Sequence, residues 1–481
     1  MIAVFLSNCN SDNNIINILG AFKVSYVTIT HSIDLASLVA NYDVHLILSN
    51  NAYKTLNLFF ESIINKLSSI FVYESGTVDI PIISTIDICN EHEPICGEFS
   101  GLSFSPSFKY VKSIENISGP MDILISTHDR HSIFLHQHRD NCEMFFLATE
   151  IQDINEKLTG KFIIKELFLG IVPFLMYIKH ITPNFLKNTN KFASLIIDDP
   201  LLNANYGYLN YDKLLSLMKI HGFFTTVAFI PWNYKRTNKH IAGLLLNNKK
   251  HIGLCVHGCD HTKSEFSNTN LYHLDKLVKI ATKRMIEHKK LTGLPFDKVM
   301  VFPQGKFSNQ AMQALKENHY MAAINTIPIS TNLYEHFQVK DFITPYITKY
   351  HDFPLFTRSN PEDIMDISFN LFIGKPAFLV IHHDYLKDNY KNLISSVMNI
   401  NSRAKYITWD GVGNIINGIL NGANIQYVNE FSSTSTDNIY GYKEKYYIYF
   451  RRRASEFRDN FLSKNNLVFR LANSIKIFFK L

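Results

Sequence analysis

Between residues 190 and 422 the sequence alternates short apolar runs with longer helical stretches, and this alternation constrains the fold most. The apolar runs that are typical of buried strands are Ala193–Ile197, Thr225–Ile230, Gly253–Val256, Lys298–Phe302, Met321–Ile324 and Ala377–Ile381. The clearest helix is expected from about Leu271 to Lys290. Because parallel strands need crossover connections, which are usually helices, the pattern predicts a deformed (β/α) barrel over residues 190–424.

The first 189 residues predict two further parts. Strand-like runs alternate with helical ones up to about residue 94, which predicts a small parallel α/β domain of flavodoxin-like type over residues 1–94. No GxGxxG or Walker motif follows its first strand, so the sequence does not support a nucleotide site there. Residues 95–189 predict a β-rich connector and a linking helix, and residues 425–481 a basic C-terminal extension.

The connector contains several histidines, and two of them have a spacing that metal ligands can use. His136 and His138 are expected to lie on one face of a strand, with His128 and His131 nearby. The alternative is that they are half-exposed strand positions in a chain with 20 histidines.

Charge is distributed unevenly along the chain. Ten of the 48 Lys and Arg and three of the 42 Asp and Glu lie in residues 443–481, so this segment carries +7 and the rest of the chain −1. A nearly neutral body argues against a nucleic-acid-binding groove. The tail predicts either a peripheral membrane or partner contact through a basic amphipathic helix at Leu467–Leu481, or a helix packed on the barrel.

Cysteine and apolar content bear on the compartment. Six cysteines without a CxxC pair argue against a disulfide framework and favour a cytoplasmic location, including the inner face of the membrane. The longest apolar stretch, Leu167–Ile178, has only twelve residues, whereas a spanning helix needs roughly 20, so a core helix kinked near Pro173 is expected.

Polar motifs follow several of the predicted strands. Asp198 and Asp199 are two adjacent carboxylates at a strand end, so one can bind a metal while the other takes a proton from water. His257 and His261 are spaced i, i+4, which allows both imidazoles to bind one ion such as Zn²⁺. Each motif alone also fits an ordinary loop.

Two more motifs close later strands. Pro303-Gln304-Gly305 is a turn that can present backbone N–H groups to a site. His382-His383-Asp384 can supply a proton donor with a carboxylate that orients its ring. Trp232, which follows the second barrel strand, can stack on a sugar ring or be a half-buried loop residue.

Taken in order, these four motifs resemble those of the polysaccharide deacetylase family, also called the NodB-homology domain or carbohydrate esterase family 4. The segments that carry the resemblance are Ile196-Ile197-Asp198-Asp199, His257-Gly258-Cys259-Asp260-His261, Val301-Phe302-Pro303-Gln304-Gly305 and Leu379-Val380-Ile381-His382. Gly258 stands where the family has a hydroxyl residue. The resemblance covers roughly residues 190–422, about half of the chain, and implies the NodB-homology type of barrel.

The resemblance also implies residue roles. Asp199, His257 and His261 match the metal triad, for which Zn²⁺ is expected, and Asp198 matches the general base.

On the same resemblance, His382 matches the general acid, with His383 as the rival because the family often has His-Asp. The Gln304 N–H matches the oxyanion donor, with Pro303 and Gly305 beside it at the substrate.

The sequence departs from the family at two motifs. Val301 stands where the family has an Arg that pairs with the base, and the Asp-x-x-Asp-Trp motif that tunes the acid is not visible. Arg358 or Asp352, which lie about where that motif belongs, are candidates for the missing charge.

The expected activity is therefore metal-dependent removal of an N-acyl group, N-acetyl above all, from a sugar or glycan in the formation of cell-surface glycans. The substrate can be free, nucleotide-linked or lipid-linked. The alternatives are an O-acyl esterase and a catalytically inactive relative that binds glycan.

Overall fold

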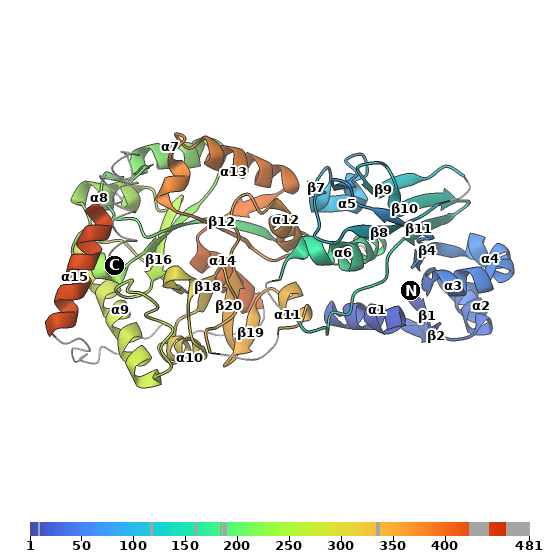
Figure 1. Cartoon of the computed structure of the whole chain (residues 1–481), viewed down its shortest axis with the longest axis horizontal. Helices are drawn as coiled ribbons and strands as arrows, with labels where there is room; N and C mark the ends of the chain where they lie inside the picture. The colour runs from blue at the N-terminus through green and yellow to red at the C-terminus, as the bar shows by residue number, and fades with distance from the viewer. Residues whose placement is uncertain are drawn as a thin grey trace. The chain divides into compact units, whose positions relative to one another are not determined.

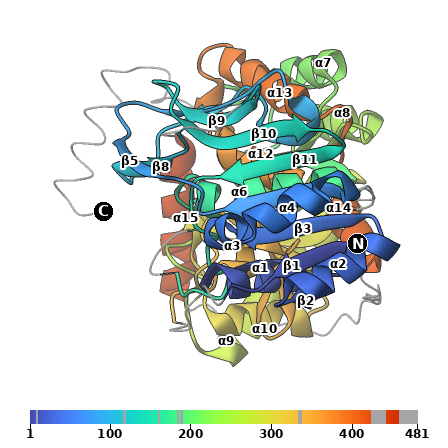
Figure 2. The same ribbon diagram turned by 90° about the vertical axis from the view of Figure 1, so that its right-hand side faces the viewer.

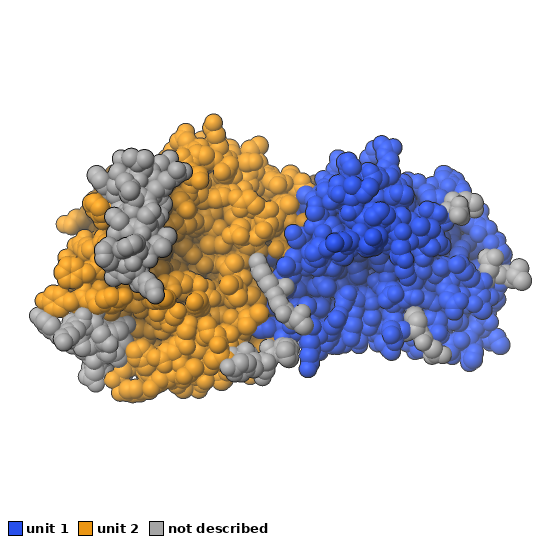
Figure 3. Space-filling model, viewed as in Figure 1, with its two compact units in different colours: residues 1–189, 336–343, 368–374 blue, residues 190–335, 344–367, 375–481 orange. Residues whose placement is uncertain are grey.

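The computed structural model describes residues 1–7, 10–115, 119–158, 162–182, 185, 190–332, 337–422 and 442–457. The chain divides into two compact units, which Figure 3 colours separately. Unit 1 comprises residues 1–189, 336–343 and 368–374, and unit 2 comprises residues 190–335, 344–367 and 375–481.

Unit 1 is built on one nine-stranded mixed sheet (Figures 1 and 2). Its order is β2-β1-β3-β4-β11-β10-β9-β6-β7, and β5 pairs separately with β8. The strands are β1 Ile2–Phe5, β2 Val27–Ile29, β3 Val44–Ser49, β4 Leu67–Tyr73, β5 Val78–Pro81, β6 Ile86–Ile88, β7 Ser103–Phe104, β8 Tyr110–Ser113, β9 Asp122–Thr127, β10 Ser132–Arg139 and β11 Cys142–Leu147. The helices are α1 Asn10–Ala21, α2 Ser32–Asn41, α3 Asn50–Thr55, α4 Asn57–Ile63, α5 Glu93–Cys96, α6 Ile164–Ile181 and α11 Lys340–Ile343.

The segments expected as a separate α/β domain and connector share this sheet. Strands β2, β1, β3, β4 and β11 are all parallel, in the 2-1-3-4-5 order of a doubly wound sheet, with β11 from the connector in the fifth place. The remaining strands continue it antiparallel. The apolar run around Pro173 forms part of helix α6, as expected. No helix among the described residues is long and apolar enough to cross a membrane.

Unit 2 is a second α/β structure around a mostly parallel sheet of order β19-β20-β18-β17-β16-β15-β12-β21, with β22 beside β12. Its strands are β12 Lys191–Asp198, β13 Asn205–Tyr206, β14 Leu209–Asn210, β15 Thr225–Phe229, β16 Ile252–His257, β17 Asp297–Val301, β18 Ala322–Asn325, β19 Ile347–Tyr350, β20 Phe353–Thr357, β21 Ala377–Ile381 and β22 Ile407–Trp409. Its helices are α7 Tyr211–His221, α8 Lys239–Asn247, α9 Leu271–Thr292, α10 Asn309–Glu317, α13 Lys391–Arg403, α14 Val412–Gly422 and α15 Tyr442–Phe457, while α12 Ile364–Phe372 has residues in both units.

The six predicted strands of this part are confirmed to within two residues at either end. The sequence analysis did not find β19, β20 and β22, of which β19 is antiparallel to β20. Beyond β20 the chain returns to β21: Ser359 pairs with Leu379, and its N–H donates to Phe378 O at 2.9 Å. The two ends of the strand series are thus linked by one bridge after β20.

An apolar cluster packs this sheet against α14. Inward residues of β12, β15, β16, β17, β18, β20 and β21 pack against Val412, Ile415, Ile416 and Leu420 of α14. Val301 is a member of this cluster, so its side chain lies in the core. Side chains along the strands alternate between the two faces of the sheet. The polar residues that follow the strands lie at its carboxyl edge, where the site forms.

Asp297, at the start of β17, is a partly buried carboxylate beside the start of α14. Its Oδ2 accepts a hydrogen bond from the Gly413 N–H at 3.2 Å. Burial raises the pKa of Asp297 from 3.8 to about 6.

A raised folded-state pKa of an acid means that the stability it contributes is complete below about pH 4 and is lost as the pH rises through 6. We therefore expect Asp297→Asn to gain stability over wild type as the pH rises, by about 3 kcal/mol in total, and to level off above about pH 7. Urea unfolding at several pH values checks this. Asp352→Asn, at an exposed turn with a φ of 56°, is the control and should show no such trend.

Candidate metal centre and active site

The predicted site residues of unit 2 meet at one edge of its sheet. β12 lies between β15 and β21, and β15 is followed by β16 and β17, all parallel. The carboxyl ends of parallel strands lie at the same edge. The register pairs Ile197 with Ile381, so Asp198 and His382 leave neighbouring strands at the same level.

Asp199, His257 and His261 form a compact cluster. The Asp199 Oδ1 atom lies 2.9 Å from the Nε2 atoms of both histidines. His257 is buried at the end of β16, and His261 stands four residues on with a left-handed φ of 56°. Asp199 is also left-handed, with a φ of 67°, so the chain turns sharply between Asp198 and Asp199. The structure thus brings together the three residues expected to bind metal.

The donor set of this cluster fits a cation. His257 Nδ1 lies 3.0 Å from the Val301 carbonyl, to which it donates, so Nε2 of the neutral ring carries a lone pair. That lone pair faces the Asp199 carboxylate, and Asp199 Oδ1 has no well-directed hydrogen-bond donor among the described residues. At this distance the ring nitrogen and the carboxylate share either a proton or a bound cation, and the spacing of the ligand atoms of all three side chains suits the cation. Two imidazoles and a carboxylate suit Zn²⁺.

The same charges shift both pKa values. Burial tends to raise the pKa of Asp199, but the adjacent His261 and His257 rings hold it well below its usual range. Burial tends to lower the pKa of His257, and the Asp199 charge overcomes this and raises it. The site therefore keeps a carboxylate at its centre.

The loop that carries the two histidines is shaped by Glu265, which the sequence analysis did not single out. Its carboxylate accepts hydrogen bonds from four consecutive backbone N–H groups at 2.9–3.2 Å. The donors are Cys259, Asp260, His261 and Thr262. A second buried pair, Arg284 with Asp260 at 2.6 Å, anchors the loop to α9. Cys259 is buried, and burial raises the pKa of its thiol, which disfavours it as a ligand.

Glu265 also explains the glycine at position 258. Gly258 has a φ of 63°, and a Cβ atom there would overlap Glu265 Oε1 and Pro303 Cγ. The hydroxyl residue that the resemblance leads one to expect at this position has no room in this loop.

Asp198 is held by Arg358. The guanidinium NH1 and NH2 atoms donate to the two Asp198 oxygens, each at 2.7 Å. Arg358 is only 6% exposed, and its Nε donates to Thr326 Oγ1 at 3.2 Å. Arg358 directly follows β20 at the carboxyl edge, whereas Asp352 precedes β20 at the opposite edge. Of the two candidates for the missing charge, the structure places Arg358 beside Asp198.

His382 and His383 have different environments. The His382 side chain is 38% exposed, and its Nδ1 lies 3.3 Å from Asp384 Oδ1. This hydrogen bond lowers the pKa of Asp384 to about 2. His383 is buried, with its ring 5.1 Å from that of Tyr206 and against Gly207. Only His382 therefore presents a ring to solvent.

The turn after β17 and Trp232 complete the set. Gln304 has a left-handed φ of 57° between Pro303 and Gly305, and its side-chain Oε1 accepts from the Ser264 N–H at 3.2 Å, so this turn touches the histidine loop. The backbone N–H of Trp232 donates to the Cys259 carbonyl at 3.0 Å, and the Arg284 guanidinium lies 5.5 Å from the centroid of the Trp232 ring. Trp232 therefore borders the loop, with Arg284 near its ring; sugar stacking there stays a prediction.

The comparisons with known proteins give structural likenesses only. No protein-family model matches the sequence, and no curated protein matches it. A protein from Mycobacterium smegmatis, assigned as a polysaccharide deacetylase, is similar with a TM-score of 0.36 and 12% identity, over 52% of this chain and 96% of its own. A family 4 carbohydrate esterase from Streptomyces lividans has a TM-score of 0.28 and 10% identity, over 45% and 88%. A family 4 pseudoenzyme from Bacillus anthracis has a TM-score of 0.28 and 11% identity, over 45% of this chain and 63% of its own.

The names of these proteins are those of the family that the motifs of this sequence resemble, the family 4 carbohydrate esterases and polysaccharide deacetylases. Identity and TM-score are low throughout, so the residue geometry alone supports any functional conclusion.

We expect Gly258→Ala to destabilise unit 2 by at least about 2 kcal/mol, because it adds left-handed strain and an overlap to the histidine loop. Metal affinity should fall as well, since His257 and His261 flank the change. Urea unfolding and zinc titration measure the two effects. Gly243→Ala is the matched control: no atom lies within 4 Å of its added Cβ, so stability should stay unchanged or rise by up to about 1 kcal/mol. Wild-type behaviour of Gly258→Ala would show that the loop has more room than the structure gives it.

Proposed function

We propose that this chain is a metal-dependent hydrolase that removes an N-acyl group, N-acetyl above all, from a sugar or glycan. The observation that carries the proposal is the different surroundings of the two adjacent carboxylates at the end of β12. Asp199 meets two histidines in a cation-binding geometry, while its neighbour Asp198 is clamped by Arg358.

Asp199, His257 and His261 would hold the ion. When bound, a divalent ion such as Zn²⁺ supplies Lewis acidity, which makes water a nucleophile at neutral pH and stabilises negative charge on an acyl oxygen.

The residues of the chain supply the proton transfers. Asp198 is the base that takes a proton from the attacking water, and Arg358 fixes both of its oxygens so that the carboxylate keeps one orientation. The His382 ring, oriented by Asp384, donates a proton to the departing amine. His382 is assigned this role over His383 because its ring is exposed. The Gln304 N–H is assigned to the acyl oxygen as it becomes negative.

The substrate class follows from the same assignments. Hydrolysis of a sugar amide needs protonation of the leaving nitrogen, for which an imidazole is suited. The alcohol of an ester leaves more readily and needs this less. Trp232, Pro303 and Gly305 are assigned to the rim that contacts the sugar. The linkage of the sugar, the cytoplasmic location and the role in cell-surface glycan formation stay predictions. The tail segment Leu467–Leu481, for which the sequence predicts either a membrane or partner contact or a helix packed on the barrel, lies outside the described residues. Within residues 442–457, Glu456 of α15 pairs with Arg236.

We expect Asp198→Asn to keep the active-site metal and to lose at least about 10²-fold in turnover, because only the proton acceptor is removed. Asp199→Asn and His257→Gln should lose the active-site metal together with turnover. Metal content, measured together with acetate release from N-acetylated oligosaccharides, separates the two classes.

Each result of that experiment has a meaning. Full activity in Asp198→Asn would refute the assignment of the base. Metal binding by wild type without acetate release from any N-acetylated or O-acetylated glycan would favour the inactive glycan-binding alternative. Release from O-acetyl esters alone would favour an esterase.

Arg358→Gln tests the clamp separately. We expect it to retain metal and to lower kcat by about 10-fold or more with little change in KM, because Asp198 is no longer oriented. The matched control is Arg236→Gln, which breaks a similar two-pronged Arg–carboxylate pair with Glu456. Equal activity of the two variants would mean that the clamp has only a structural role.

A further inference from the structure

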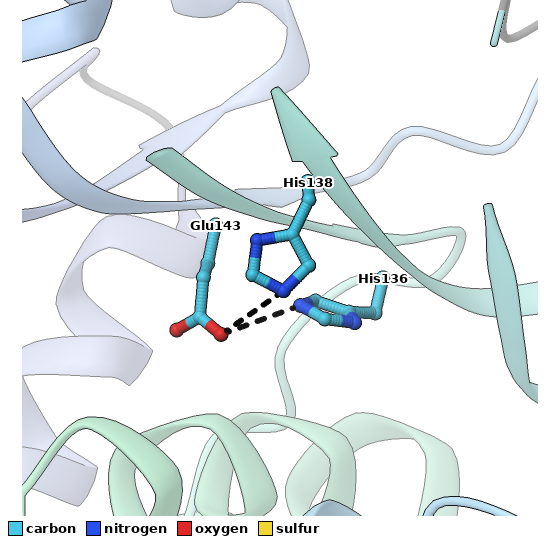
Figure 4. Close-up of side chains that lie close together, drawn as sticks. All are labelled: His136, His138 and Glu143. Carbon is cyan, nitrogen blue, oxygen red and sulfur yellow. Dashed lines mark ion pairs between the residues drawn. The ribbon is translucent and has the colours of Figure 1, made fainter. Parts of the chain in front are cut away.

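Unit 1 contains a second cluster of metal-ligating side chains, on the sheet face covered by α6. Figure 4 shows His136, His138 and Glu143 pointing toward one another from β10 and β11. His138 and Glu143 are directly paired across the two antiparallel strands, and His136 lies two residues before His138 on the same face. Strand register therefore sets the spacing of all three.

The distances between the ligand atoms are too long for hydrogen bonds and suit a shared ion. Glu143 Oε1 lies 3.7 Å from His136 Nε2 and 3.6 Å from His138 Nε2. Ligands bound tetrahedrally at about 2.0–2.1 Å from one zinc lie about 3.3–3.5 Å apart. A small contraction of the side chains would place all three atoms around one ion.

His136 is prepared as a ligand. It is 5% exposed, and its Nε2 atom has no hydrogen-bond partner among the described residues although it is buried. Its other nitrogen, Nδ1, lies 3.2 Å from Asp122 Oδ2 on the neighbouring strand β9. When Nδ1–H donates a hydrogen bond to a carboxylate, the Nε2 atom of the neutral ring keeps its lone pair and the ring is oriented, which is the usual arrangement behind a metal-bound histidine. That lone pair is directed at Glu143.

Helix α6 fixes the other side of Glu143. His180, in the last turn of α6, places Nε2 at 2.9 Å from Glu143 Oε2. The helix is set on the sheet by Tyr177, whose hydroxyl lies 2.8 Å from Ser69 Oγ. One oxygen is thus oriented by His180 and the other is turned to the two β10 histidines.

We propose that unit 1 binds a divalent transition metal of the zinc class through His136, His138 and Glu143, with His180 positioning the carboxylate. Two imidazoles and one carboxylate favour such an ion over Ca²⁺ or Mg²⁺, which prefer oxygen ligands. Because the His138 side chain is 65% exposed, a fourth position is open to water and the ion can exchange with solvent. This site lies in a different unit from the proposed active site and does not depend on the function proposed for it.

The experiment uses the full-length chain, stripped of metal by a chelator and titrated with ZnCl₂. Bound zinc is counted by elemental analysis. We expect His136→Gln, His138→Gln and Glu143→Gln each to hold one equivalent less than wild type, or to bind that equivalent at least 100-fold more weakly. His257→Gln in the active site should leave this equivalent in place, so failure of one metal site is distinguishable from failure of the other.

The control is His128→Gln. His128 is an exposed histidine of unit 1 that lies 3.3 Å from Asp87, and its loss should leave the zinc count unchanged. His138→Gln is the variant least expected to disturb folding, because the His138 side chain is mostly exposed. Circular dichroism of the metal-free variants checks the fold. Addition of ZnCl₂ should raise the Tm of wild type more than that of His138→Gln.

Two results would overturn the proposal. Unchanged zinc content in both His138→Gln and Glu143→Gln would show that the cluster is a metal-free set of ion pairs. Loss of zinc in His138→Gln but not in the buried-site variant His136→Gln would show adventitious binding to a surface histidine only.

Discussion

The candidate active site depends on keeping two adjacent carboxylates, Asp198 and Asp199, at one strand end and giving each its own separate partners. Like charges this close repel strongly where water is scarce. The left-handed turn at Asp199 sends the two side chains in different directions. One meets the Arg358 guanidinium and the other meets two imidazoles. The remaining features of the site, from the Glu265 loop to the Val301 carbonyl, serve to hold these partners in place.

The departures from the family pattern become intelligible in these terms. The Arg expected at position 301 is absent because that side chain lies in the apolar cluster against α14, where Val fits and a guanidinium would be buried without a partner. A guanidinium instead reaches Asp198 from the end of β20. The hydroxyl residue expected at position 258 is replaced by Gly because the Glu265 carboxylate fills that space and binds the loop backbone. Arg358 thus pairs with Asp198 although position 301 holds a core valine.

Unit 1 and unit 2 use the same physical device in different sheets. In both, the Nδ1–H of a histidine donates a hydrogen bond to an oxygen, and its Nε2 atom faces a carboxylate. The acceptor is the Val301 carbonyl for His257 and the Asp122 carboxylate for His136. In unit 2 the ligands come from loops after parallel strands. In unit 1 they come from the faces of an antiparallel pair, where the register of β10 against β11 sets the spacing. A rigid scaffold with such preoriented rings favours ion binding, because little side-chain freedom is lost on ligation.

The sequence by itself determined six strands of unit 2, the order of the motifs that follow them, and the spacing of His257 and His261, because apolar periodicity and i, i+4 spacing are local properties. It also marked His136 and His138 as sharing a strand face. Only the tertiary structure decided that Arg358 and not Asp352 serves Asp198, since that depends on which edge of the sheet each one occupies. It likewise brought in Glu265, Glu143 and His180, and joined the first 94 residues to the connector in one sheet. These contacts join residues that are far apart in the chain, or depend on the conformation of a loop, and no local sequence pattern encodes them.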